Sequence, residues 1–370
     1  MKMKHLKGIA LAAAAVVGLA ACGGSSESSD TTAAAGGDYS NLKVAVVYIG
    51  VPGDAGYTYQ HDQGIAALEA ELGITVTRLE NIPEGAESAA TFDQLAAEGY
   101  NLIFGTSFGY MDPMLEVSAK YPNVCFEHAT GYKTSTNLGT YFGAAEEARY
   151  LSGIAAGKAS PTGKLGYVAA FPIPEVIRGI NAFTLGAQSV NPDATVQVSW
   201  TKTWFDPTIE KEASESLLDA GVDVLAMHQD TTAAGVAAEA RGAKWVGYNS
   251  DVKEAAPAAW LTAPTWNWGP FYVQTAKAVA GGTCPNDEYY GSMADGMVTL
   301  ASFGDSVDAD TQALIAEKAA AIIDGSFAPF QGPVTDQDGN EVVAADVRPE
   351  LLDLLGMSYF VKGVIGSPKG

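Results

Sequence analysis

The sequence has 370 residues, of which 43 are acidic and 21 are basic, so its formal net charge is −22 at pH 7. This balance argues against nucleic acid as a partner, because a nucleic-acid-binding surface needs a basic stripe that neutralises phosphates. The length exceeds what one ordinary hydrophobic core holds, so we expect two domains.

The first 21 residues have the pattern of a lipoprotein signal peptide. Lys2, Lys4 and Lys7 precede an apolar run, residues 9–19, which is too short to span a bilayer. The run ends in Leu-Ala-Ala before Cys22, which is a lipobox, so Cys22 is the predicted lipidation site. The alternative is a buried N-terminal helix, but the coincidence of a charged start, an apolar run and a lipobox favours the signal peptide.

Residues 22–40 are predicted to be a disordered tether. They are rich in Gly, Ser, Thr and Ala, which cannot bury enough apolar surface to offset the entropy lost on ordering. We therefore expect an extracytoplasmic protein, lipid-anchored to the cell membrane, on the periplasmic face if the cell has an outer membrane.

The rest of the chain alternates between strand-like and helix-like segments. Amphipathic stretches such as residues 63–71 and 210–220 separate apolar runs at residues 43–49, 76–80, 102–106, 124–127, 165–169, 196–200, 224–227 and 245–247. This alternation is typical of parallel sheets covered by helices on both faces. The pattern runs twice, with a break at residues 157–163, which indicates two similar α/β lobes joined by a hinge.

Ligands of such sheets bind beyond the carboxyl ends of the strands, and the segments that follow these strands are rich in aromatic and polar residues. Flat rings beside directional polar groups suit a planar heteroaromatic solute. Such rings also occur in α/β cores, and a sugar pocket would use aromatic residues as well. The candidate ligand-binding residues are Asp54, Tyr57, Tyr59, Phe108, Tyr110, His128, Trp204, Asp206, Gln229, Asp230, Asp251 and Trp266.

Other kinds of site have weaker support. His61, His128 and His228 raise a zinc hypothesis, but no two of them have close ligand spacing, and we predict neither a metal nor a cofactor. No catalytic motif with a known mechanism is present, so we predict no enzymatic activity. The Asp and Asn residues at 336–340 surround Gly339 and predict a hairpin turn rather than a calcium loop.

Two cysteines remain after Cys22. Cys125 and Cys284 could pair only if their Cα atoms came within disulfide range, which the sequence does not establish. We expect two separate thiols, with Cys125 buried at a strand end.

Several segments resemble the basic membrane protein family of substrate-binding lipoproteins, which includes purine-nucleoside-binding components of ABC importers. The resemblance covers about residues 41–365 and is carried by the lipobox and by residues 53–58, 126–130, 175–183, 247–251 and 296–301. It implies an α/β type I periplasmic-binding-protein fold, in which two Rossmann-like lobes with parallel sheets are joined by a three-strand hinge and close around the ligand. Lobe 1 would comprise residues 41–148 plus about 266–292, and lobe 2 residues 149–265 plus about 293–370.

The resemblance also assigns roles to individual residues. The family's Asp-Lys-Ser-Phe-Asn loop maps onto residues 54–58, so Tyr57 keeps a stacking ring and Thr58 replaces asparagine. The family's ribose-binding acid maps onto Asp251, and its ribose-binding lysine maps onto Trp266. Loss of that lysine weakens the case for a nucleoside.

We therefore predict a lipid-anchored solute-binding protein that delivers a purine to the permease and ATPase subunits of an ABC importer and acts as a monomer. A free base such as adenine is favoured over a nucleoside. The alternatives are another aromatic or sugar-like ligand, a sensor that signals to a membrane receptor, and a nucleoside hydrolase.

Overall fold

The computed structural model describes residues 38–370. The predicted signal peptide, the predicted lipidation site Cys22 and most of the predicted tether lie outside the described residues. None of the helices within 38–370 is long and apolar enough to cross a membrane.

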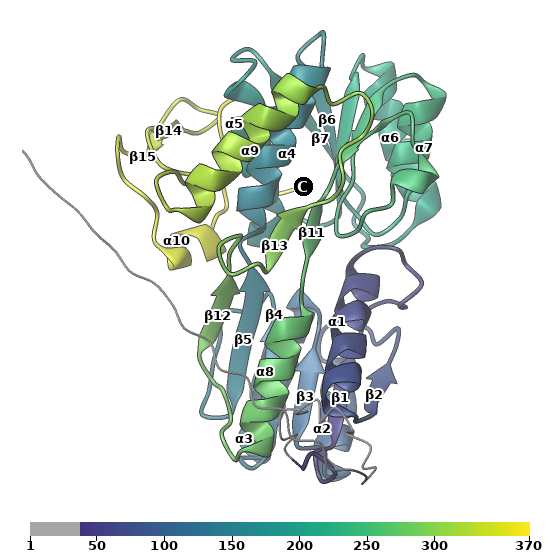
Figure 1. The fold of residues 1–370 in the computed structure, drawn as a ribbon, viewed down its shortest axis with the longest axis vertical. Helices are drawn as coiled ribbons and strands as arrows, with labels where there is room; N and C mark the ends of the chain where they lie inside the picture. The colour runs from purple at the N-terminus through teal and green to yellow at the C-terminus, as the bar shows by residue number, and fades with distance from the viewer. Residues whose placement is uncertain (1–37) are drawn as a thin grey trace, which may run out of the picture. The chain divides into compact units, whose positions relative to one another are not determined.

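Five strands from the first part of the described chain and β12 from a later part form a six-stranded parallel sheet, and we call the part built on it lobe 1 (Figure 1). Its strand order is β12-β5-β4-β3-β1-β2. These strands are β1 (Val44–Val47), β2 (Val76–Leu79), β3 (Leu102–Gly105), β4 (Cys125–Ala129), β5 (Leu138–Gly143) and β12 (Glu288–Gly291). The helices of this lobe are α1 (Tyr57–Leu72), α2 (Ser88–Ala97), α3 (Met111–Lys120) and α8 (Gly269–Ala280).

A second six-stranded parallel sheet, in the order β10-β9-β8-β6-β7-β16, is the basis of lobe 2. Its strands are β6 (Lys164–Ala169), β7 (Thr195–Trp200), β8 (Val224–His228), β9 (Lys244–Val246), β10 (Trp260–Thr262) and β16 (Val364–Ile365). The helices are α4 (Ala145–Ala159), α5 (Pro174–Gln188), α6 (Pro207–Asp219), α7 (Ala233–Ala240), α9 (Ala309–Ile323) and α10 (Leu351–Leu355).

Successive side chains of each strand point to opposite faces of the sheet and build a core on both faces. In lobe 1, Val44 and Val46 pack toward α1 and α8, whereas Ala45 and Val47 pack toward α2 and α3. In lobe 2, α4 and α5 cover one face of the sheet, and α6 and α7 cover the other. The apolar runs of the sequence are continuous because both faces of these strands are buried.

The chain passes between the lobes at three places (Figure 1). It runs from β5 into α4, from β10 through β11 (Pro264–Trp266) into α8, and from β12 into β13 (Val298–Leu300). Strands β11 and β13 pair antiparallel, whereas the first connection is the short turn at Ala144. The expected periplasmic-binding-protein architecture is confirmed, although only two of the three connections are strands. The residues at which one lobe gives way to the other stay a prediction.

The predicted strands are confirmed within a few residues, and two strands that the sequence did not suggest complete lobe 1. These are β5 and β12, which pair with each other in parallel. The hairpin expected at residues 336–340 is also confirmed, since β14 (Val334–Thr335) and β15 (Glu341–Val343) pair antiparallel around it.

The expectation of two separate thiols is wrong. Cys125, at the start of β4, forms a disulfide with Cys284, and their Cα atoms lie 5.5 Å apart across a sequence separation of 159 residues. The pair forms because the chain returns to lobe 1 at α8, and the segment between α8 and β12 lies next to the amino end of β4.

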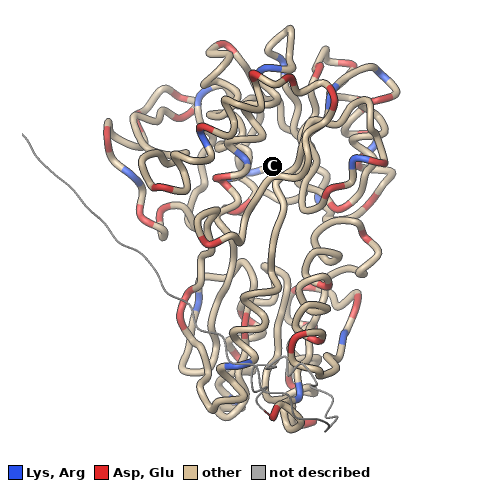
Figure 2. Tube along the Cα trace, viewed as in Figure 1, with Lys and Arg blue, Asp and Glu red and all other residues tan. Residues whose placement is uncertain are grey.

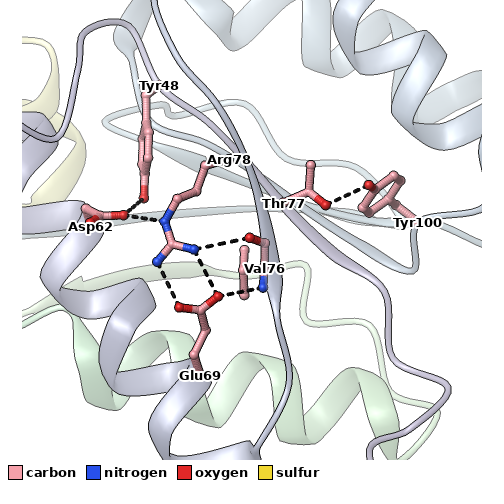
Figure 3. Close-up of polar contacts among 7 residues, drawn as sticks. All are labelled: Tyr48, Asp62, Glu69, Val76, Thr77, Arg78 and Tyr100. Atoms are coloured by element: carbon pink, nitrogen blue, oxygen red, sulfur yellow. Dashed lines mark hydrogen bonds and ion pairs between the residues drawn. The ribbon is translucent and has the colours of Figure 1, made fainter.

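A polar network fixes α1 against β2 on the outside of lobe 1 (Figure 3). The Arg78 guanidinium on β2 donates to both carboxylate oxygens of Glu69, each at 2.9 Å, and to Asp62 at 2.6 Å. Tyr48 donates to the same Asp62 oxygen at 3.0 Å. Helix α1 is thereby held by charge-assisted bonds as well as by its apolar face.

Acidic residues are spread over both lobes rather than gathered in one patch (Figure 2). The negative net charge is therefore a property of the whole surface, which favours solubility.

Candidate functional site

A cavity of about 380 Å³, which is partly open to solvent, lies between the carboxyl ends of the two sheets. Lobe 1 contributes residues that follow β1, β3 and β4, and lobe 2 contributes residues that follow β6, β7, β8 and β9. This is the position at which open α/β sheets bind ligands. The lining residues are Ile49, Tyr57, Ser107, Phe108, Thr130, Glu175, Trp204, His228, Gln229, Asp230, Tyr248 and Asn249.

Five of the candidate residues line this cavity: Tyr57, Phe108, Trp204, Gln229 and Asp230. Tyr57 begins α1, and its hydroxyl is buried with no hydrogen-bond partner among residues 38–370. Trp204 packs on Phe171 and donates from Nε1 to the Glu84 carboxylate of lobe 1 at 3.3 Å. Rings from both lobes therefore face one cavity.

The Gln229 side chain forms hydrogen bonds within lobe 2. In the amide orientation that satisfies both ends, Nε2 donates to the Trp204 carbonyl at 3.0 Å, and the side-chain oxygen accepts from the Thr201 hydroxyl. The side chain thus holds the loop that carries Trp204.

Asp230 joins the lobes across the cavity. Its Oδ1 accepts from the Tyr57 backbone N–H at 2.9 Å and from Asn249 Nδ2 at 3.0 Å. A Cβ at Gly56 would lie 2.9 Å from the Asp230 Cα, so glycine permits the close approach of the two backbones. Gln60 Nε2 donates to Ser250 Oγ at 3.0 Å beside it. The lobes are closed on each other along this line.

Burial governs the electrostatics of the cavity. It raises the pKa of Asp230 well above the usual range for a carboxyl, and the nearby Asp54 carboxylate raises it further. Burial also raises the pKa values of Tyr57 and Tyr248, and the Glu175 carboxylate adds to both shifts. The Tyr248 hydroxyl, like that of Tyr57, is buried without a partner. Both phenols are neutral hydroxyls that a ligand could engage.

Two candidate acids lie outside the lining and cap helices. Asp54 accepts from the backbone N–H groups of Gly56, Thr58 and Tyr59 at 2.8–3.0 Å, at the start of α1. Asp206 accepts from the first-turn N–H groups of α6 at 2.9 and 3.1 Å. Both carboxylates satisfy donors that helix termini leave free.

Three aromatic candidates also lie outside the lining. Tyr59 is partly exposed on α1, whereas Tyr110 is buried against Phe92 and donates to the Ile82 carbonyl. His128 Nε2 donates to the Ser107 carbonyl at 2.7 Å and thereby supports a loop that does line the cavity. Burial lowers the pKa of His128 to about 4, so this imidazole is neutral at pH 7.

The two positions that the family resemblance assigns to ribose do not line the cavity either. Asp251 accepts from the Ser302 hydroxyl and backbone N–H. Trp266 is 6% exposed and stacks on Trp268 with ring centroids 4.9 Å apart. Its Nε1 donates to Asn249 Oδ1 at 2.8 Å, so Trp266 supports a lining residue from behind.

Seven lining residues were not among the candidates: Ile49, Ser107, Thr130, Glu175, His228, Tyr248 and Asn249. Six of them end a strand or stand within three residues of its end, so strand position alone would have found them. Glu175 lies further on, in the first turn of α5, at the end of the segment 171–175 that follows β6.

Metal binding finds no support in the part of the chain that the structure describes. Residues 38–370 contain no group of three or more His, Cys, Asp or Glu side chains placed to hold an ion. His61 stacks on Trp268 and pairs with the Tyr272 hydroxyl at 2.6 Å, while His228 faces Glu175 and Arg149.

Known proteins resemble this chain over most of its length. The family model of PnrA-like ABC transporter substrate-binding proteins matches residues 41–331. A purine-binding protein of Brucella abortus is 46% identical over 325 residues, which are 87% of this chain and 93% of that protein. A Haloferax volcanii protein named as a glucose-binding protein of an ABC transporter is 38% identical and covers 88% of this chain and 81% of its own.

A solved structure shares the fold. The solute-binding protein of an ABC transporter system from Aeropyrum pernix superposes with a TM-score of 0.69 at 21% identity, over 79% of this chain and 94% of that one. The family match, the identity to relatives and the two-lobed fold lead to the same conclusion. The chain belongs to the PnrA-like Bmp family of ABC transporter substrate-binding proteins.

Proposed function

We propose that this protein binds a purine in the cavity between its lobes, as a free base in preference to a nucleoside, and presents it to an ABC importer. The observation that carries the proposal is the set of rings from both lobes, Tyr57, Phe108, Trp204 and Tyr248, around one cavity. Stacking of a base on an aromatic side chain contributes ~1–3 kcal/mol. The 46% identity to a purine-binding protein supports the same ligand class.

The preference for a free base rests on the two ribose positions of the family resemblance. Asp251 is hydrogen-bonded to Ser302, and Trp266 packs behind Asn249, so neither side chain reaches the cavity. A nucleoside would have to place its ribose without these contacts. Trp266 is likewise too far behind the lining to stack on the base.

Isothermal titration calorimetry with adenine, guanine, hypoxanthine, their nucleosides and glucose tests the proposal. We expect stoichiometric binding of at least one base, weaker binding of its nucleoside, and recovery of the ligand chemically unchanged. Unchanged ligand separates a binding protein from a nucleoside hydrolase. Equal affinity for base and nucleoside would contradict the preference, and binding of none of the purines would contradict the ligand class.

A sugar is the second candidate, because the relative at 38% identity is named as glucose-binding. Aromatic rings and acidic side chains also occur in sugar pockets. Binding of glucose without binding of any purine would favour this alternative.

The proposal also covers where the protein acts and how it is anchored. ABC substrate-binding proteins act outside the cytoplasm and deliver their ligand to permease and ATPase subunits. We propose that Cys22 carries a lipid that anchors the protein there, on the strength of the lipobox, and that the protein acts as a monomer.

A further inference from the structure

Glu175 is the acidic side chain in the lobe 2 part of the cavity that forms no hydrogen bond or ion pair with lobe 1 in the described residues. It stands in the first turn of α5, after Pro174, and its side chain is 10% exposed. Its Oε1 lies 3.2 Å from His228 Nε2, and the described residues provide no other hydrogen-bond partner for its carboxylate. Asp230, by contrast, has Oδ1 engaged by Tyr57 and Asn249.

The contacts of Arg149 determine which ring nitrogen of His228 carries the proton. Arg149 is fully buried, donates from Nη1 to the Met227 carbonyl at 2.9 Å, and places Nη2 3.3 Å from His228 Nδ1. A guanidinium can only donate, so His228 Nδ1 is the acceptor. The proton of the neutral imidazole is then on Nε2, which donates to Glu175. Burial lowers the pKa of His228, in agreement with a neutral ring.

The same contacts bring a buried positive charge close to Glu175. The Arg149 guanidinium lies 3.5 Å from the centroid of the Tyr248 ring, but it forms no direct ion pair with any carboxylate in residues 38–370. Buried charges require compensation. Glu175 supplies the negative charge through His228, and an ionised carboxylate offers only acceptors.

The cavity thus presents an acceptor-only carboxylate beside two hydroxyls without partners. These are the hydroxyls of Tyr57 and Tyr248, which line the same cavity as Glu175 and have no hydrogen-bond partner within residues 38–370. A ligand that fills this space has to offer a donor to the carboxylate, since a buried acceptor left unpaired is costly.

Building on the proposed function, we propose that Glu175 is a specificity-determining ligand contact that accepts a hydrogen bond from an N–H of the purine. The donor is either the exocyclic amine or a ring N–H, and both have the same chemistry toward a carboxylate. Purines that offer such a donor are bound, and analogues in which that N–H is methylated are rejected.

Calorimetry of wild type and Glu175→Gln with adenine, N6,N6-dimethyladenine and 9-methyladenine tests this role. Glutamine keeps the shape and removes the charge, so we expect adenine to bind about 10-fold or more weakly, as for loss of a hydrogen bond to a charged group. The analogue that lacks the critical N–H should bind wild type weakly and show little further loss in Glu175→Gln. Which analogue behaves this way identifies the donor.

The control is Glu127→Gln, which removes a buried carboxyl of lobe 1 that does not line the cavity. It should bind adenine as wild type does. Equal adenine affinity in wild type and Glu175→Gln, or an equal effect of Glu175→Gln on all three ligands, would overturn the role of Glu175 while purine binding stands. Absence of purine binding in wild type would instead overturn the proposed function, and this contact with it. Thermal unfolding of Glu175→Gln separates a binding defect from a folding defect.

Discussion

Among single residues, Trp266 shows how a side chain outside the cavity can govern the residues that line it. Its indole donates to Asn249, Asn249 donates to Asp230, and Asp230 accepts from the Tyr57 backbone across the cavity. Trp266→Phe should keep the stacking on Trp268 and leave Asn249 Oδ1 buried without a donor, at a cost of ~1–3 kcal/mol in unfolding free energy. Urea unfolding measures this loss, and calorimetry should find weaker ligand binding.

Trp200→Phe is the matched control for this prediction, because it also removes an indole hydrogen bond, to the Ser367 carbonyl, away from the cavity. It should leave ligand affinity unchanged. If Trp266→Phe and Trp200→Phe have the same effect on affinity, the hydrogen bonds from Trp266 to Tyr57 do not act on the ligand.

At the scale of elements, the contact between α4 and α5 depends on the absence of side chains. A Cβ at Gly186 of α5 would lie 1.9 Å from the Tyr150 carbonyl oxygen of α4, which is backbone and cannot move by itself. Gly186→Ala should force the helices apart and lower the unfolding free energy by about 1–3 kcal/mol or more. Gly179→Ala, in the same helix, would bring its Cβ no closer than 3.4 Å to Arg149 and should change stability little. Denaturant unfolding of both variants compares them; equal stability would mean that the two helices move apart at no cost.

At the scale of the whole molecule, the disulfide links the two stretches of chain that build lobe 1, the one before lobe 2 and the one after it. Cys125 belongs to β4, and Cys284 stands between α8 and β12, which reach lobe 1 only after the chain has built most of lobe 2. A cross-link that closes so long a loop stabilises a protein by ~3–5 kcal/mol in the chain-entropy description. Reductant should therefore lower the melting temperature of wild type and leave a Cys125→Ala, Cys284→Ala double variant unaffected. An equal response of both proteins to reductant would contradict a stabilising disulfide.

The sequence by itself determined the α/β class, the positions of most strands along the chain and the edge of the sheets at which the cavity lies. These properties are local, because a buried parallel strand reads as an apolar run and its carboxyl end follows directly in the chain. Tyr57, Phe108, Trp204, Gln229 and Asp230 were found on this basis.

Only the tertiary structure decided which polar groups face the cavity and which have other partners. Asp54 and Asp206 stand near strand ends but cap helices, and Trp266 turns its donor to Asn249 rather than to the cavity. Glu175 follows β6 but reaches the cavity from the first turn of α5, so its position in the chain did not show that it lines the cavity. The Cys125–Cys284 pairing likewise depends on a return of the chain over 159 residues. Partners that are distant in sequence leave no periodic signal, because the fold, rather than the local pattern of side chains, brings them together.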